Sequence, residues 1–98
     1  KGRVSLAYNA YFVTTVTQNR IPYFKDFYCA RLLVTEMRRL HEENQLTSLA
    51  WVIMPDHLHW LFQLQGNQSL SQIVRLLKGR SGYRINRAYP VAAPNHHM

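Results

Sequence analysis

The sequence predicts an α+β fold in which a strand, a helix, two further strands and a second helix follow one another. Three observations support this order. Residues 10–17 and 47–65 are rich in β-branched and aromatic side chains. Residues 26–44 and 69–88 place apolar side chains at helical spacing. Asn, Gly and Pro, which favour turns, separate these segments.

The first strand and the first helix are predicted as follows. Residues 1–9 show no clear hydrophobic period, so we expect a leader into the strand at 10–17. Asn19 and Pro22 then break the strand pattern. From Asp26, a favourable N-cap, to about Asn44 the apolar positions have the spacing of one helix face: Ala30, Leu33, Val34, Met37 and Leu40.

The second and third strands lie on either side of Pro55 and Asp56. Residues 47–54 are a nearly continuous apolar run, which is typical of a central strand covered on both faces. From His57 to about residue 65, period-two alternation puts His57, His59 and Leu61 on one face. The other face is apolar, so we expect it in the core and the histidine face open: Leu58, Trp60, Phe62 and Leu64.

The second helix begins at a capping box, with Ser69 as N-cap and Gln72 three residues later. Its expected buried stripe contains Leu70, Ile73, Val74 and Leu77. Five basic residues follow with no acid among them, and they are the candidate DNA-binding residues: Arg75, Lys78, Arg80, Arg84 and Arg87. The alternative is that this basic face is only solvated.

The order strand, helix, strand, strand, helix is the first five elements of the ferredoxin-like split β-α-β plan. Its last strand is not visible, so we expect it to be missing or supplied by the tail or a partner chain. An unpaired sheet edge favours pairing with another chain, and we therefore expect a homodimer. We place a single domain at 1–98, with its core at about 8–88 and an extended tail at 89–98.

Composition limits the class of protein. The formal net charge of +7 favours a polyanionic partner. The longest apolar run, 49–54, is far shorter than the roughly 20 residues of a membrane span, so we expect no membrane partner. A single cysteine, Cys29, and no recognisable signal peptide favour a reducing cytoplasm.

The two histidines of the third strand are candidate metal ligands. Residues two apart on a strand are separated by about 7 Å, which lets two imidazoles converge on one cation. A His-x-His pair is by itself a weak motif. His57 as a polar turn residue and His59 as an exposed strand residue are the alternative.

Three segments, 11–22, 52–62 and 70–79, resemble successive blocks of the single-tyrosine HUH transposases, in particular the REP-associated tyrosine transposases of bacteria. The Met-Pro-Asp-His-Leu-His stretch at 54–59 is the most specific part, and the resemblance covers about 8–88. It implies a cytoplasmic bacterial DNA transposase that acts as an endonuclease and strand transferase on single-stranded or hairpin DNA.

The resemblance also implies a catalytic site. His57 and His59 would hold Mg²⁺ or Mn²⁺ against the scissile phosphate. A tyrosine would attack and leave a 5′-phosphotyrosine and a free 3′-hydroxyl. In the family this tyrosine lies on a later helix, with a polar residue that completes the metal shell, and no such block is present in this sequence.

We therefore expect this chain to be truncated before the nucleophile. Tyr83 and Tyr89 are the late tyrosines, and Tyr83 is better explained as a helix residue that packs or stacks on DNA than as a nucleophile. The alternative function is a non-catalytic module that binds single-stranded nucleic acid on a ferredoxin-like sheet.

Overall fold

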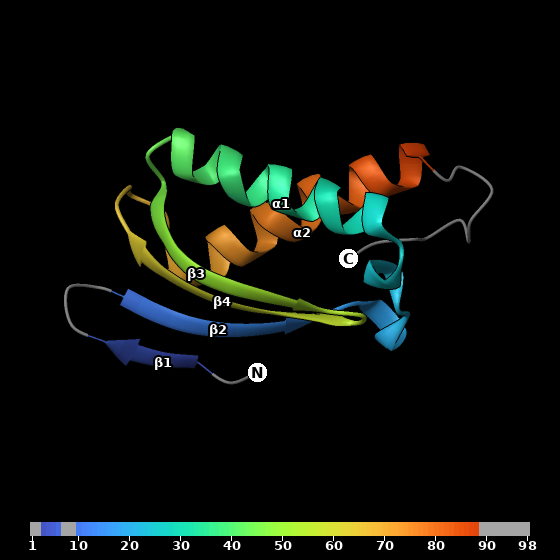
Figure 1. Cartoon of the computed structure of the whole chain (residues 1–98). Coiled ribbons are helices and arrows are strands. Elements are labelled where there is room, and N and C mark those ends of the chain that lie inside the picture. Colours follow the sequence, from blue (N-terminus) through green and yellow to red (C-terminus); the bar gives the residue numbers. More distant parts are fainter. Residues whose placement is uncertain (1–2, 7–9, 89–98) are drawn as a thin grey trace.

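The structure, a computed structural model, describes residues 3–6 and 10–88 (Figure 1). The predicted order of strand, helix, strand, strand and helix is confirmed, and a further strand precedes it. Two 3₁₀ turns, η2 and η3, lie between β2 and α1. The elements are β1 Arg3–Leu6, β2 Ala10–Val16, η2 Gln18–Arg20, η3 Tyr23–Lys25, α1 Phe27–Glu42, β3 Leu46–Met54, β4 His57–Leu64 and α2 Leu70–Ala88.

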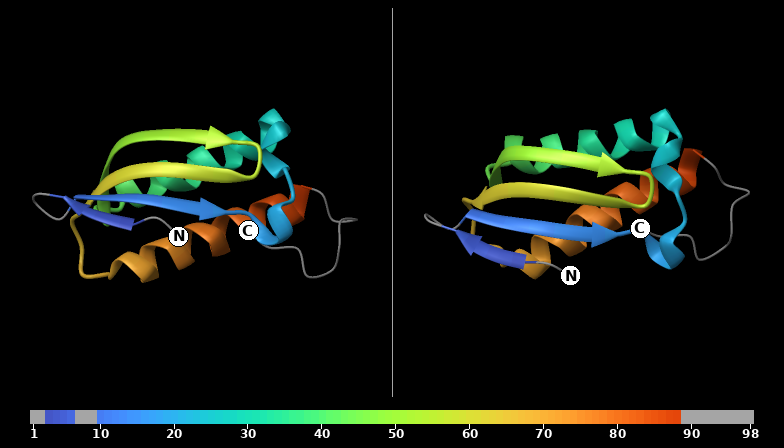
Figure 2. Two further views of the ribbon diagram at one scale, coloured as in Figure 1. Left: turned by 90° about the horizontal axis from the view of Figure 1, so that it is seen from below. Right: turned by 60° about the horizontal axis from the view of Figure 1, so that its bottom comes forward.

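The elements form two layers, a sheet and a pair of helices. All strand pairs are antiparallel, and the strand order is β1-β2-β4-β3. Both helices cover the same face of this sheet, and its other face is turned toward the viewer, without a helix, in Figure 2. The core lies between the layers, where Phe62 of β4, Leu33 of α1 and Ile73 of α2 are completely buried. The α+β ferredoxin-like prediction is therefore confirmed.

Strand β4 has the alternation that the sequence predicts. Leu58, Trp60 and Phe62 are at most 1% exposed and belong to the core. His57 and His59 lie on the opposite face and are partly exposed. Because β2 and β4 are neighbours, as are β3 and β4, the histidine strand is hydrogen-bonded on both sides.

Strand β1 occupies the sheet edge that we expected the tail or a partner chain to supply. It pairs with β2 from Arg3↔Val13 to Leu6↔Ala10. We expected residues 1–9 to be only a leader into the first strand, and residues 3–6 instead form a strand of their own. Antiparallel backbone pairing does not require a hydrophobic period. The expected extended tail at 89–98 lies outside the described residues.

Strand β3 is at an edge of the sheet formed by the described strands, and the prediction of a central strand covered on both faces is wrong. Four of its apolar side chains are 40–54% exposed: Leu49, Trp51, Val52 and Met54. The apolar run was misleading because β4 folds back between β3 and β2, which leaves β3 on the outside. An apolar run alone does not distinguish a buried central strand from an exposed edge.

The helix starts agree with the predicted caps. The Asp26 carboxylate accepts a hydrogen bond from the Tyr28 backbone N–H at 2.8 Å. At the second helix, the Ser69 N–H donates to Gln72 Oε1 at 2.7 Å, and the Gln72 N–H donates to Ser69 Oγ at 3.2 Å. Among the described residues, neither helix is long and apolar enough to cross a membrane.

Candidate metal and nucleic-acid site

His57 and His59 are side by side on the uncovered face of the sheet. Their ring centroids are 4.9 Å apart, and the ring planes are nearly perpendicular, at 85°. Their strand is held by β2 on one side and β3 on the other. The two rings therefore project from a rigid part of the fold, at a separation that suits two ligands of one cation.

A hydrogen bond holds Nδ1 of each ring. His57 Nδ1 lies 2.7 Å from Asp56 Oδ1, and His59 Nδ1 lies 3.0 Å from Thr14 Oγ1 on β2. These bonds leave Nε2 of each ring for a ligand. Metal-binding histidines commonly have their second nitrogen fixed in this way by a carboxylate or another polar group.

Asp56 is ionised at neutral pH. The hydrogen bond from His57, aided by the hydrogen bond and charge of Arg20, lowers the pKa of this carboxyl below its usual value, against the effect of burial. Arg20 Nε donates to Asp56 Oδ2 at 2.9 Å. Both carboxylate oxygens of Asp56 are therefore engaged by protein groups, one by Arg20 and the other by the candidate ligand His57.

Apolar side chains surround the two histidines. Strand register puts Phe12 and Val16 of β2 and Val52 and Met54 of β3 on the histidine face, and all four are exposed. The Phe12 ring lies parallel to the His59 ring, with an interplanar angle of 10° and centroids 5.7 Å apart. The candidate ligands thus lie on a mainly apolar, accessible surface.

The donor set fits part of a cation shell. No group of three or more His, Cys, Asp or Glu side chains converges anywhere within residues 3–6 and 10–88. Mg²⁺ and Mn²⁺ favour six ligands with many oxygens, and Mg²⁺ commonly keeps several waters or binds substrate phosphates. Two imidazole ligands would leave room for such oxygen ligands.

The structure does not bring Tyr83 to the histidines. Tyr83 is on α2, in the helical layer, whereas His57 and His59 are on the opposite face of the sheet. Its side chain is 61% exposed, and its hydroxyl accepts a hydrogen bond from Arg87 Nη1 at 3.0 Å. Tyr89, the other late tyrosine, lies outside the described residues.

The remaining described tyrosines are also on the helical side. Tyr11 pairs with Phe62 in the strand register, which directs it toward the helices, and Tyr23 packs against the core. Burial, and secondarily the nearby Cys29 thiol, raises the pKa of Tyr23. Tyr28 is on α1 and is exposed. None of these described residues supplies a hydroxyl to the histidine face.

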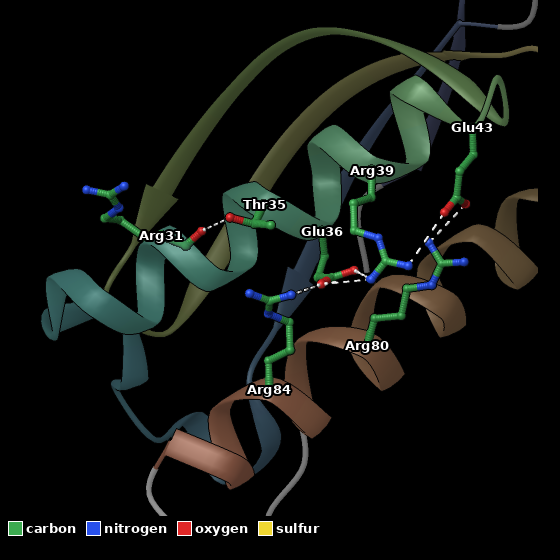
Figure 3. A network of polar contacts seen from close by, with 7 residues as sticks. All are labelled: Arg31, Thr35, Glu36, Arg39, Glu43, Arg80 and Arg84. Atoms are coloured by element: carbon green, nitrogen blue, oxygen red, sulfur yellow. Dashed lines mark hydrogen bonds and ion pairs between the residues drawn. The ribbon is translucent and has the colours of Figure 1, made fainter.

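The five basic residues of α2 do not form one free surface. Arg80 Nη1 is 3.0 Å from Glu43 Oε1, and Arg84 Nη1 is 3.3 Å from Glu36 Oε2 (Figure 3). Lys78 is half-buried. Arg75 and Arg87 are exposed, and neither forms an ion pair with a described residue. The acids that pair with α2 come from α1, so the absence of acids among the basic residues of α2 does not leave all of these residues unpaired.

Sequence reasoning overlooked three residues that shape this region. Glu36 falls on the buried face of α1, three residues after Leu33, and that spacing was the available signal. Thr14 and Arg20 reach the histidine site through strand register and a loop. No local pattern marks such contacts, because they join segments that are distant in the sequence.

Comparisons with known proteins give a consistent result. The family model described as IS200-like transposase matches residues 6–97. The ISDra2 transposase TnpA of Deinococcus radiodurans is 35% identical over 54 residues, which are 55% of this chain and 39% of that protein. The matched segment thus spans about two fifths of that curated relative.

Two solved structures are similar to this chain. One is a crystal structure from Deinococcus radiodurans assigned as a transposase, with a TM-score of 0.71 and 29% identity; the match covers 92% of this chain and 68% of that one. The other is a REP-associated tyrosine transposase bound to a REP hairpin, with a TM-score of 0.65 and 19% identity. This match covers 100% of this chain and 61% of that one. At that identity the second comparison supports the fold alone.

Proposed function

The chain belongs to the family of IS200-like transposases, and on this premise we propose that it acts in metal-dependent cleavage and joining of single-stranded DNA. The observation that supports the chemistry best is the pair His57 and His59 on the uncovered sheet face, with Nδ1 of each ring held by a protein group. Because the DNA of a bacterium is in the cytoplasm, we propose that the chain acts there.

His57 and His59 would bind Mn²⁺ or Mg²⁺ through Nε2. The bound cation would polarise a phosphoryl oxygen of the scissile phosphate and orient the phosphodiester for in-line attack. The protein contributes the fixed direction of the two rings: β4 is paired on both sides, and Asp56 and Thr14 hold the other ring nitrogens. Such preorganisation reduces the reorganisation that the reaction requires.

We propose that the attacking tyrosine comes from outside the described residues or from another chain. The reason is geometric, because the described tyrosines lie on the helical side of the sheet or in the helical layer. Attack by the phenolic oxygen on phosphorus would form a 5′-phosphotyrosine and release the 3′-hydroxyl. That phosphodiester could then be joined to a second strand without an external energy source.

For the substrate we propose single-stranded DNA with a hairpin. Arg75 and Arg87 are exposed on α2 and available for phosphate contacts. Phe12 is exposed beside His59 and offers a ring on which an unpaired base could stack. The similar REP-associated transposase is bound to a REP hairpin, which makes a hairpin the first substrate to test.

We further propose that two copies pair through β3. Among the described strands β3 is at one edge of the sheet, and its exposed side chains are apolar. A groove of about 440 Å³ with aromatic residues Phe27 and Trp51 in its lining continues this apolar surface toward α1.

Analytical ultracentrifugation tests this pairing. The variants Leu49→Lys and Val52→Lys should each sediment as monomers, whereas the loop variant Asn67→Lys should remain dimeric. A monomeric parent chain would contradict this proposal.

The deciding experiment combines cation binding with a cleavage assay. Mn²⁺ binding to the chain is measured by electron paramagnetic resonance, and a labelled single-stranded hairpin is then incubated with protein and Mn²⁺. We expect the His57→Ala, His59→Ala double variant to lose Mn²⁺ binding. A covalent protein–DNA band on a denaturing gel, abolished in the same variant, would identify a tyrosine of this chain as the nucleophile.

Two control variants test whether the effect is specific to this histidine pair. His41→Ala removes an exposed histidine from α1, on the other side of the sheet, and His96→Ala with His97→Ala removes the histidines near the end of the sequence. Both should bind Mn²⁺ as the parent chain does. Unchanged Mn²⁺ binding in the His57, His59 variant, with hairpin binding intact, would instead support a non-catalytic nucleic-acid-binding module.

A further inference from the structure

The loop before α1 contains two consecutive residues in the left-handed region. Asn19 has φ 57° and Arg20 has φ 55°, and neither is a glycine. Asparagine tolerates this region comparatively well, but for arginine it costs roughly 1 kcal/mol or more. Strain of this kind persists only when surrounding contacts maintain it. The contacts of Arg20 and its neighbours must therefore hold it in this conformation.

Arg20 and the adjacent residues are held against the turn that precedes the histidine strand. The Thr17 N–H donates to the Asp56 carbonyl at 2.9 Å, and the Phe24 N–H donates to the Pro55 carbonyl at 2.9 Å. Within the loop, Thr17 Oγ1 donates to the Ile21 carbonyl at 2.7 Å. These bonds place the two ends of the 17–24 segment on the same two-residue turn.

The Asp56 carboxylate connects this loop to His57. Oδ2 accepts from Arg20 Nε at 2.9 Å, and Oδ1 is 2.7 Å from His57 Nδ1. An ionised carboxylate can only accept hydrogen bonds. The proton of this bond is therefore on His57 Nδ1, and in the neutral ring the lone pair is on Nε2.

We propose that Asp56 and Arg20 are positioning residues that keep His57 in the tautomer with its proton on Nδ1 and its lone pair on Nε2. The strained turn at 19–20 serves to present the Arg20 side chain to Asp56. The effect on the ring does not require a cation, but its use in binding Mn²⁺ rests on the function proposed above. Outer partners of this kind typically change metal affinity 10- to 100-fold.

The tautomer can be measured directly without metal. Long-range ¹H–¹⁵N correlation spectra of the labelled chain at neutral pH distinguish a protonated ring nitrogen from one with a lone pair. We expect His57 to have its proton on Nδ1 in the parent chain. In Asp56→Ala and in Arg20→Gly we expect this preference to weaken or disappear, and Mn²⁺ affinity to fall about tenfold.

The glycine variants separate positioning from a structural role. Arg20→Gly relieves the backbone strain and removes the guanidinium, so it should leave the free energy of unfolding unchanged or raise it while it weakens Mn²⁺ binding. Asn19→Gly relieves the adjacent strain and keeps Arg20, so tautomer and affinity should remain those of the parent chain. A purely structural role of Arg20 predicts loss of stability with no change in the His57 spectrum.

Three results would overturn the inference: a proton on Nε2 of His57 in the parent chain, an unchanged tautomer in Asp56→Ala or in Arg20→Gly, or unchanged Mn²⁺ affinity in variants whose tautomer has changed. If the parent chain binds no Mn²⁺, the proposed function fails separately. The spectra would still decide whether Asp56 and Arg20 control the ring. Arg20→Gly keeps the test valid even if Asp56→Ala does not fold.

Discussion

Glu36 illustrates how a single buried charge connects two elements of this fold. Its side chain is completely buried on α1. Arg39 Nη1 lies 3.0 Å from one of its carboxylate oxygens and 3.3 Å from the other, which also receives Arg84 Nη1 of α2 at 3.3 Å (Figure 3). A buried carboxylate is tolerated only when it is paired in this way. Glu36 thus contributes to the docking of α2 on α1.

Replacement of Glu36 by Gln should therefore lower the free energy of unfolding. We expect a loss of about 2 kcal/mol, less than for a fully buried ion pair because both arginines are partly exposed. Urea denaturation followed by circular dichroism measures the change. Glu42→Gln, at an exposed position of the same helix, should change the free energy by less than about 0.5 kcal/mol. Equal effects of the two variants would contradict this account.

Tyr23 makes stability depend on pH at the alkaline end. Burial, and secondarily Cys29, raises the pKa of Tyr23 in the folded protein. The folded state consequently holds this proton more tightly than the unfolded state. The resulting stabilisation is complete below the ordinary tyrosine pKa of about 10 and is lost as the pH rises through the folded pKa.

Denaturation near pH 9 and near pH 11 should show this loss. We expect the free energy of unfolding of the parent chain to fall more between these two values than that of Tyr23→Phe, which has no phenolic proton. Tyr28→Phe, which alters an exposed tyrosine on α1, should behave as the parent chain does. An identical pH slope for Tyr23→Phe and the parent would show that Tyr23 does not titrate differently in the two states.

At the scale of elements, α2 shows that glycine does not always mark a break. The helix runs without interruption from Leu70 to Ala88, across both Gly79 and Gly82. A glycine inside a helix weakens it, and it often marks a break or a close approach of another backbone. At Gly79 a Cβ atom would have no neighbour within 4 Å, so no close approach explains the residue.

Gly79→Ala should accordingly stabilise the protein. Alanine has a helix propensity about 0.8–1 kcal/mol more favourable than that of glycine, which corresponds to a rise in Tm of about 4–8 °C for a domain of this size. Thermal unfolding measures the shift. Gly66→Ala provides the contrast, because its Cβ would lie 2.8 Å from Gln45 Oε1 and should bring no comparable gain. A Tm for Gly79→Ala at or below that of the parent would refute the propensity argument.

At the scale of the whole molecule, the arrangement of charge matters more than its sum. The sequence has a formal net charge of +7. Two arginines of α2, Arg80 and Arg84, interact with glutamates of α1, whereas Arg75 is exposed and forms no ion pair within the described part of the chain. Arg80 and Arg84 therefore support the packing of the two helices, and Arg75 is available for contact with a phosphate.

This division predicts different effects of two arginine substitutions. Arg75→Ala should reduce the slope of log affinity against log salt by about 0.7, the value for one phosphate contact with a single strand, and should not change stability. Arg84→Ala should lower stability because it removes one partner of the buried Glu36 carboxylate. Fluorescence anisotropy with a labelled hairpin at several salt concentrations, beside urea denaturation, measures both. An unchanged slope in Arg75→Ala would exclude that contact.

Much of the fold follows from local patterns in the sequence. The order of strands and helices, both helix caps and the two faces of β4 were all predicted, because side-chain period and capping depend on residues that are close along the chain. The two candidate ligands were found for the same reason, since their shared face follows from a spacing of two. The segments that resemble the transposase family are likewise continuous stretches, and the family match bears that resemblance out.

Only the tertiary structure decided which segments meet. Strand β1 pairs with β2 without a pattern of its own, and β3 is at the edge although its sequence is that of a buried strand. The contacts of Arg20 with Asp56 and of Glu36 with Arg84 join residues that are distant along the chain. Their partners depend on how the layers pack and on the strand order, which no local spacing encodes.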